Sequence, residues 1–197
     1  MAFSIAQYAA LRPTLWHLTH SNNLDSIRKS RVLQPADCLV SAAQNGIRCN
    51  RQVTPGNPVL RDQKLLHEKC IAFESGLSMD DFLKELARRV FFWSGCPDRP
   101  IKPGRHAINT YAASDVVIRF PFLDVAEANT PYFSRCNSGA TRMQHGKPVP
   151  RGPGTFLQAI QCNFPPSKVV EVTFIHSVML PQTAQVARTL AGPWETL

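Results

Sequence analysis

The sequence predicts an α+β protein, in which short strands and helices are interspersed along a single domain spanning residues 1–197. Three observations predict this class. Apolar runs rich in β-branched and aromatic residues suit buried strands, and they occur at Leu15–Leu18, Val90–Trp93, Asp115–Phe122 and Lys168–Val178. Segments with helical periodicity and polar capping residues lie between these runs. A chain of 197 residues has the size of one domain, and it contains no internal repeat.

The stretch Leu15–Leu33 is expected to form a strand followed by a helix. Its apolar residues first follow a strand pattern and then recur at one-turn spacing. Ser21 or Asn22 is expected to cap the helix, because a short polar side chain can accept a hydrogen bond from an unpaired backbone N–H. His17 and Thr19 lie two residues apart, so on a strand they point to the same face. Polar side chains at the end of a strand, just before a helix, could hold a polar ligand.

The remaining elements follow from the same patterns. Helices are expected at Ser4–Leu11, at about Ser78–Arg89, at 105–113 and at 181–191, with one or two helical turns at 155–160. Segments 34–58 and 130–154 are rich in Gly, Pro and Asn, and they are expected to be loops, the first with one helical turn. Long loops inside a compact domain are usually functional or disordered.

The formal net charge of +8, with a pI near 9.5, suits a polyanionic partner such as nucleic acid, or a nucleotide substrate. The alternative is a basic protein with a solvated charged face, because net charge alone does not identify a site. Basic and aromatic residues alternate in segment 130–154, and this pattern suits single-stranded nucleic acid.

Several classes of function are excluded or disfavoured by missing motifs. The six cysteines form no CxxC pair, which argues against a zinc ribbon and favours reduced thiols in the cytoplasm. There is no HExxH, GxGxxG, GxxxxGK[ST] or GxSxG pattern, so no metal is expected, and Rossmann, P-loop and α/β-hydrolase sites are unsupported. No apolar run reaches the roughly 18 residues needed to span a bilayer, so no membrane partner is expected.

Glu171 is the least usual residue of the strand predicted at Lys168–Val178. A carboxylate among apolar β-branched residues is costly unless it is paired or functional. Two interpretations stay open on this pattern alone. Glu171 is either a structural residue, in an edge strand or paired with a nearby arginine, or it is a functional carboxylate.

Two segments resemble motifs of the DarT-like ADP-ribosyltransferases, toxins that modify nucleic acid. WHLTHSNNLDSIRKSRVL resembles their opening motif, an aromatic-His-x-Thr strand followed by Asn-Leu and a helix, and VVEVTFIHSVMLP resembles their closing motif, a Glu inside an apolar strand. Three further segments, LRDQ at 60–63, RVFFW at 89–93 and RGPGTF at 151–156, are similar to an uncharacterised bacterial family associated with the same fold. The resemblance implies a split, strongly bent β-sheet with peripheral helices and with NAD, as co-substrate, in the cleft.

The resemblance also implies roles for individual residues. His17 would contact the ribose or amide of NAD, with Thr19 and Asn23 completing that part of the pocket. Phe92 or Trp93 would lie against the nicotinamide, and Glu171 would be the catalytic carboxylate.

Arg61 would position NAD and the target base, and Arg51 is an equally placed rival for this role. Each assignment has a structural alternative. His17 could be a core histidine, Phe92 and Trp93 could be plain core residues, and the segment beginning at Arg151 could be a simple turn.

The function expected from the resemblance is transfer of ADP-ribose from NAD to a base of single-stranded DNA or RNA. In that family the enzyme is commonly a toxin, often in antiphage defence, so an antitoxin or chaperone protein is a further expected partner. Two alternatives stay open. One is a transferase that modifies protein or an enzyme that hydrolyses NAD, and the other is a non-catalytic basic module that binds nucleic acid.

Overall fold

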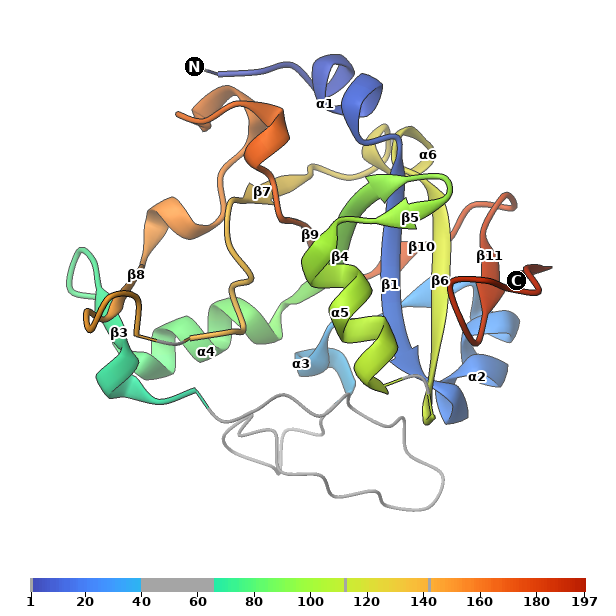
Figure 1. The fold of residues 1–197 in the computed structure, drawn as a ribbon, viewed down its shortest axis with the longest axis horizontal. Helices are drawn as coiled ribbons and strands as arrows, with labels where there is room; N and C mark the ends of the chain where they lie inside the picture. Colours follow the sequence, from blue (N-terminus) through green and yellow to red (C-terminus); the bar gives the residue numbers. More distant parts are fainter. Residues whose placement is uncertain (1, 40–65, 112, 142) are drawn as a thin grey trace.

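The computed structural model describes residues 2–39, 66–111, 113–141 and 143–197 (Figure 1). The helices are α1 (Ile5–Leu11), α2 (Leu24–Ser30), α3 (Ala36–Leu39), α4 (Met79–Ala87), α5 (Lys102–Tyr111) and α6 (Leu123–Ala126). The strands are β1 (Thr14–His20), β2 (Val32–Leu33), β3 (Ile71–Phe73), β4 (Arg89–Cys96), β5 (Arg99–Pro100), β6 (Asp115–Pro121), β7 (Tyr132–Ser134), β8 (Val149–Arg151), β9 (Glu171–Ile175), β10 (Val178–Met179), β11 (Gln185–Ala187) and β12 (Glu195–Thr196). The predicted α+β class is confirmed.

One antiparallel sheet organises the described residues. Its strands run in the order β12-β11-β6-β1-β4-β9-β7, and β5 pairs with β4 at one end. Two small pairs, β10 with β2 and β3 with β8, lie outside it. The first predicted strand and the strand containing Glu171 therefore belong to the same sheet, with β4 between them.

The two central strands of this sheet, β1 and β4, part from each other along their length. In their ladder, Thr14 pairs with Gly95, Leu15 with Ser94 and Trp16 with Trp93. Beyond Trp16, β1 stays paired with β6 as far as His20, while β4 stays paired with β9 as far as Arg89. The sheet therefore forks between β1 and β4.

Each face of the sheet carries its own apolar cluster. On one face, Phe92 of β4 packs edge-on against Phe120 and Phe174, with ring centroids 5.4 and 5.6 Å apart. Residues of α1, α2 and α6 complete this larger cluster. On the other face, Trp16 and Trp93 pack with Ile108 of α5. The alternation of side chains along β4 therefore sends neighbouring aromatics to opposite faces.

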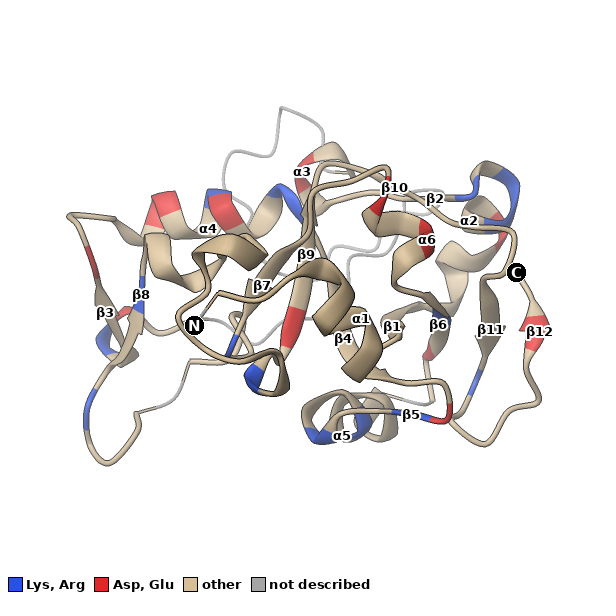
Figure 2. Cartoon of the chain, turned by 90° about the horizontal axis from the view of Figure 1, so that it is seen from above, with Lys and Arg blue, Asp and Glu red and all other residues tan. Residues whose placement is uncertain are grey.

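Helix α5 lies directly on the second face because Gly104 has no side chain there. A Cβ atom at Gly104 would lie 2.9 Å from both Cβ and Cγ of Trp93, so any larger residue would force the helix away from the sheet. Figure 2 shows α5 on the side of the sheet opposite α2 and α6. This close approach fixes α5 beside the fork.

Several predicted elements are confirmed. The strands at β1, β4 and β6 and the helices at α1, α4 and α5 lie where the sequence patterns indicate, although α5 begins earlier and β4 ends later than expected. Ser78 caps α4 as predicted, accepting a hydrogen bond from the Asp81 N–H. The turns expected at 155–160 occur as two 3₁₀ turns, at Pro153–Thr155 and Ala159–Gln161.

The prediction of a helix at 181–191 is wrong. Gln185–Ala187 forms β11, which pairs with the edge of β6 left open by β1. Val186 and Ala187 are buried there. This segment has a modest helix propensity, but pairing with a distant strand removes its apolar surface from water. The strand is therefore favoured over the helix.

Three further expectations need correction. Segment 130–154 is not a continuous loop, because it contributes β7 to the main sheet and β8 to a pair with β3. The strand expected at Lys168–Val178 covers only β9, since a 3₁₀ turn precedes it and His176, with φ of 68°, ends it. Neither Ser21 nor Asn22 caps α2, because these residues lie in a 3₁₀ turn capped by the His20 side chain. In segment 34–58, Ala36–Leu39 forms α3, where one helical turn was expected, and residues 40–58 lie outside the described residues.

Candidate functional site

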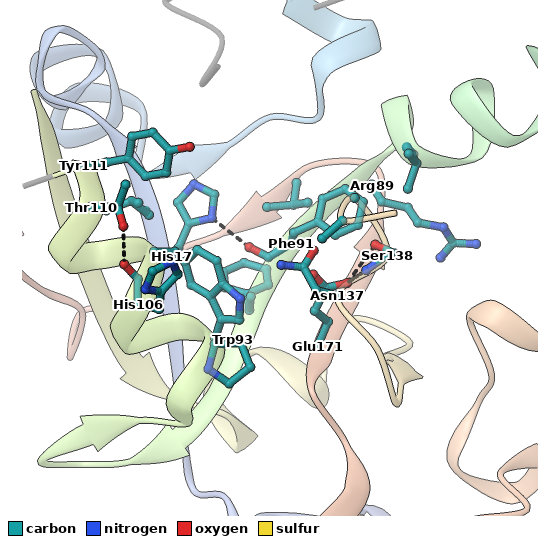
Figure 3. A pocket seen from close by; sticks show the side chains of 18 of the residues that line it. His17, Arg89, Phe91, Trp93, His106, Thr110, Tyr111, Asn137, Ser138 and Glu171 are labelled. Atoms are coloured by element: carbon teal, nitrogen blue, oxygen red, sulfur yellow. Dashed lines mark hydrogen bonds between the residues drawn. The ribbon is translucent and has the colours of Figure 1, made fainter. Parts of the chain in front are cut away.

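A pocket of about 450 Å³ lies at the fork between β1 and β4. Its walls come from β1, β4 and β9, from α5, and from the segment 137–141 (Figure 3). A volume of this size is within the range of about 300–1,000 Å³ that small-molecule and cofactor sites occupy. His17 and Glu171, the two residues on which the sequence-based hypothesis depends most, both line it.

Glu171 lies inside the sheet and not at its edge. It pairs with Trp93 of β4 on one side and with Ser134 of β7 on the other. Its side chain is 5% exposed. The interpretation of Glu171 as a residue of an edge strand is therefore wrong, and its carboxylate is a buried acid on the wall of a pocket.

The Glu171 carboxylate is held by one residue of the neighbouring loop. Ser138 donates to Oε2 of Glu171 from its backbone N–H at 3.0 Å and from its hydroxyl at 2.7 Å. Burial raises the pKa of the Glu171 carboxyl to about 7, while these two hydrogen bonds and the positive charge of Arg151 oppose the rise. A carboxyl with a pKa near 7 can take up and release a proton at neutral pH.

Arg151 fixes the loop that carries Ser138. Its guanidinium is buried and donates to the carbonyl oxygens of Asn137, Ser138, Ala140 and Pro150 at 2.8–3.4 Å. The interpretation of the segment beginning at Arg151 as a simple turn is therefore incomplete. Arg151 positions Ser138, and Ser138 in turn positions Glu171.

His17 stands where β1 and β4 part. Its Nδ1 is 2.9 Å from the carbonyl oxygen of Phe91, which can only accept, so Nδ1 carries the hydrogen. Its ring lies 5.4 Å from that of Phe92, centroid to centroid. Side chains at positions 16 and 17 point to opposite faces of β1, and the fork gives His17 access to the pocket.

The two aromatic candidates have different positions. The Phe92 ring is 1% exposed and belongs to the core cluster of the opposite face. Trp93 is the direct cross-strand neighbour of Glu171, so its indole and the carboxylate share one face of the sheet (Figure 3). Trp93 is therefore the aromatic residue that the geometry favours beside Glu171.

Helix α5 supplies the side of the pocket opposite the loop at 137–141. His106, Thr110 and Tyr111 line it, and the first two are exposed. The Thr110 hydroxyl donates to the His106 carbonyl oxygen at 2.7 Å, a bond within the helix. The sequence patterns indicated a helix here but gave no reason to assign these residues to a site.

Arg89 adds a buried positive charge to the pocket wall. Its guanidinium forms an ion pair with Glu85 at 3.0 Å and lies over the rings of Phe156 and Tyr132, 4.3 and 4.8 Å from their centroids. Burial lowers the pKa of Arg89, and the Glu85 carboxylate opposes that change. Arg89 also donates to Thr173 of β9 at 3.4 Å. Arg89 therefore joins α4, through Glu85, to β9, through Thr173.

The other predicted site residues lie elsewhere. Among the described residues that line the pocket, neither Thr19 nor Asn23 occurs. The Asn23 side chain donates to the Thr19 hydroxyl at 3.1 Å, and Thr19 is buried. Arg61 and its rival Arg51 lie outside the described residues. The roles of these four residues stay predictions.

Sequence reasoning did not assign Ser138, Arg151, Arg89 or the α5 residues to the site. Their signals were present but weak: Ser138 lies in a loop rich in glycine and asparagine, and RVFFW and RGPGTF carry the two arginines.

Within the described ranges, no group of three or more His, Cys, Asp or Glu side chains is arranged to hold a metal ion. In the same residues, no helix is long and apolar enough to cross a membrane.

Comparison with known proteins places the chain in one family. Residues 13–184 match the model of a family of unknown function, DUF7002, and the chain belongs to this family. The match covers every strand of the pocket, including both Trp93 and Glu171. Searches among curated proteins and among solved structures gave no match.

Proposed function

We propose that this pocket binds NAD and that the protein transfers ADP-ribose from it to an acceptor. The observation that carries the proposal is the convergence of His17, Trp93 and Glu171 on one pocket, in the order and on the strands that the resemblance to ADP-ribosyltransferases implies. The fork between β1 and β4 is the feature that supports a split sheet of the ADP-ribosyltransferase type.

The residues present fit this substrate. Trp93 offers an aromatic surface for the nicotinamide ring, and His17 offers a polar ring at the fork. Asn137 and Ser138 add polar groups, and Arg89 adds positive charge to the same wall. Ligand pockets combine apolar walls with a few placed polar groups in this way.

The Glu171 carboxylate would serve the reaction in two ways. As the bond between nicotinamide and ribose breaks, its electrons leave with the nicotinamide and positive charge develops on the anomeric carbon. A fixed carboxylate next to that carbon stabilises the charge. The acceptor amine or hydroxyl then bonds to the carbon and releases a proton, which the Glu171 carboxylate accepts.

The acceptor we propose is single-stranded DNA or RNA, modified on a base. The charge of +8 supports a polyanion, and a base must be unstacked before its edge can react. Segment 130–154 contributes less to this interface than its composition suggests, because Arg151 is buried in structural hydrogen bonds. Arg135 and Lys147 remain exposed, and Arg142 lies outside the described residues. A role as a bacterial toxin or antiphage effector in the cytoplasm, with an antitoxin or chaperone protein as partner, completes this proposal.

The experiment is transfer of label from NAD in parallel reactions with single-stranded DNA, single-stranded RNA and soluble protein. Glu171→Gln tests the carboxylate, and Glu127→Gln is the control, because Glu127 is an exposed carboxylate of the same type. Label on one acceptor that is lost only in Glu171→Gln would support the transferase and identify the acceptor.

Other outcomes would select the alternatives. Label on protein would indicate a protein-directed transferase, and free ADP-ribose without label on any acceptor would indicate an NAD hydrolase. Intact NAD together with salt-sensitive binding to nucleic acid would reject catalysis and leave a binding module.

A further inference from the structure

We propose that the exposed face of α5 binds the phosphate backbone of a single-stranded polynucleotide while one of its bases enters the pocket. The inference rests on the proposed function, because the polynucleotide is the acceptor of that reaction. It assigns a binding surface to a helix that the sequence patterns did not connect with any site.

The first observation is unpaired positive charge. Lys102 and Arg105 are exposed and lie three residues apart, which makes them neighbours on the helix surface. α5 contains no acidic residue, and in the described parts of the chain neither cation pairs with a carboxylate. The nearby Asp98 pairs with Arg99 at 3.6 Å. Figure 2 shows the basic positions of α5 with no acidic segment on the helix.

The second observation is that this charged face leads into the pocket. Lys102, His106 and Thr110 recur at intervals of four residues, so their side chains form one row along the helix. His106 and Thr110 at the end of this row line the pocket, whereas Lys102 lies at its beginning. A chain of phosphates held at Arg105 and Lys102 would therefore cross the exposed face of the helix toward the residues that line the pocket, with Arg105 on the flank away from the pocket and Lys102 between.

The third observation is that the helix is held firmly. Gly104 and Ile108 are buried on the inner face of α5, against Trp93 and the rest of the second apolar cluster. The outer face therefore presents its cations from a fixed support, which lowers the entropy lost when a flexible strand binds.

Cations next to aromatic rings favour a polynucleotide over an acidic protein. Tyr111, the last residue of α5, lines the pocket one position beyond the row of Lys102, His106 and Thr110. Phosphates pair with cations while bases stack on aromatic rings, so both parts of a nucleotide have a matching surface here. An acidic peptide would need only the cations.

The test measures binding of a fluorescent single-stranded oligonucleotide, as DNA and as RNA, over a series of salt concentrations. Each phosphate contact to a single strand contributes about 0.7 to the slope of log K against log salt. The double variant Lys102→Ala/Arg105→Ala loses two such contacts, so the magnitude of the slope should decrease by about 1.4. This corresponds to affinity about 25-fold weaker at 0.1 M salt, with the difference vanishing near 1 M.

The control is Lys29→Ala/Lys84→Ala, which removes two exposed lysines from α2 and α4 and changes the net charge equally. Its slope should equal that of the wild type. Equal slopes for the two double variants would overturn the proposal, since the contacts would then be spread over the surface. Thermal unfolding of both double variants is measured as well. The slopes can be compared when both variants unfold at the same temperature as the wild type.

Failure of this inference is distinguishable from failure of the transferase. A wild type that binds no oligonucleotide, yet labels protein from NAD, would reject the α5 surface and keep the transferase. A wild type that binds oligonucleotide through α5 but leaves NAD intact would keep the surface and reject the transferase.

Discussion

The two sides of the pocket differ in how firmly their polar groups are held. On the β9 side, Glu171, Ser138 and Arg151 are buried and joined in one chain of hydrogen bonds. On the α5 side, His106 and Thr110 are exposed, and the Thr110 hydroxyl donates to the His106 carbonyl oxygen within the same helix. One side resembles the interior of a protein, and the other resembles a surface.

This difference separates two tasks. A buried carboxylate with fixed donors can keep its geometry and an altered pKa, which is what proton transfer and charge stabilisation require. An exposed helix face with free cations can meet a long and flexible ligand. We therefore expect variants on the β9 side to change rate and stability, and variants on the α5 side to change acceptor binding.

The largest expected effect is on the rate. Glu171→Gln keeps the shape of the side chain but removes its charge, and loss of one well-placed electrostatic group costs about 3–4 kcal/mol of barrier. Turnover should fall roughly 100- to 1,000-fold, while KM for NAD changes little. Steady-state kinetics on Glu171→Gln and on the control Glu127→Gln measure the change in turnover and in KM. A change confined to KM would mean that Glu171 only binds the substrate.

The second effect is on stability and its dependence on pH. The pKa of the Glu171 carboxyl is about 7 in the folded protein and 4.5 ordinarily. Between these values the folded state binds a proton that the unfolded state has lost. Stability from this group is therefore complete below pH 4.5 and is lost as pH rises through 7, by about 3 kcal/mol.

Glu171→Gln removes this titration and serves as the comparison. The variant should gain stability relative to the wild type as pH rises from 5 to 8. Urea unfolding at several pH values measures the difference. A difference that does not vary with pH would show that burial does not raise the pKa of Glu171.

The elements that local patterns determine could be predicted from the sequence. β1, β4 and the strand around Glu171 all have strong local signals, and they supply His17, Trp93 and Glu171, respectively.

The parts that depend on distant partners could not be predicted. β11 forms because β6 offers an open edge, and nothing within residues 181–191 reports that edge. The tie between Arg151 and Ser138 joins residues 13 positions apart through backbone carbonyls, which have no sequence signature. Ser138 and Arg151 were missed from sequence because such contacts hold them, whereas the α5 residues were missed because nothing in their helix pattern reports the strands beside it.

The third prediction concerns Arg151. Arg151→Ala removes the donors of several carbonyl groups around the Ser138 loop, and an unsatisfied buried polar group costs about 1–3 kcal/mol. We expect a loss of about 2–4 kcal/mol in the free energy of unfolding, measured with urea. Arg135→Ala, at an exposed position directly after β7, should change the free energy of unfolding by less than about 0.5 kcal/mol. Equal losses in the two variants would show that Arg151 does not anchor the loop.

The smallest expected effect is that of the Ser138 hydroxyl. Ser138→Ala removes the donor at 2.7 Å but keeps the backbone N–H at 3.0 Å, so the carboxylate loses part of its stabilisation. The pKa of Glu171 should rise by about one further unit, because a hydrogen bond to a charged group contributes about 1.5–3 kcal/mol. Titration of the labelled glutamate carboxyl carbon by NMR measures this without any assay of activity. Ser94→Ala, which removes a buried hydroxyl that bonds Tyr8 instead, should leave the titration unchanged. A shift in both variants would trace the effect to general loosening of the sheet, and a shift in Ser138→Ala alone would establish that the loop tunes the acid of the pocket.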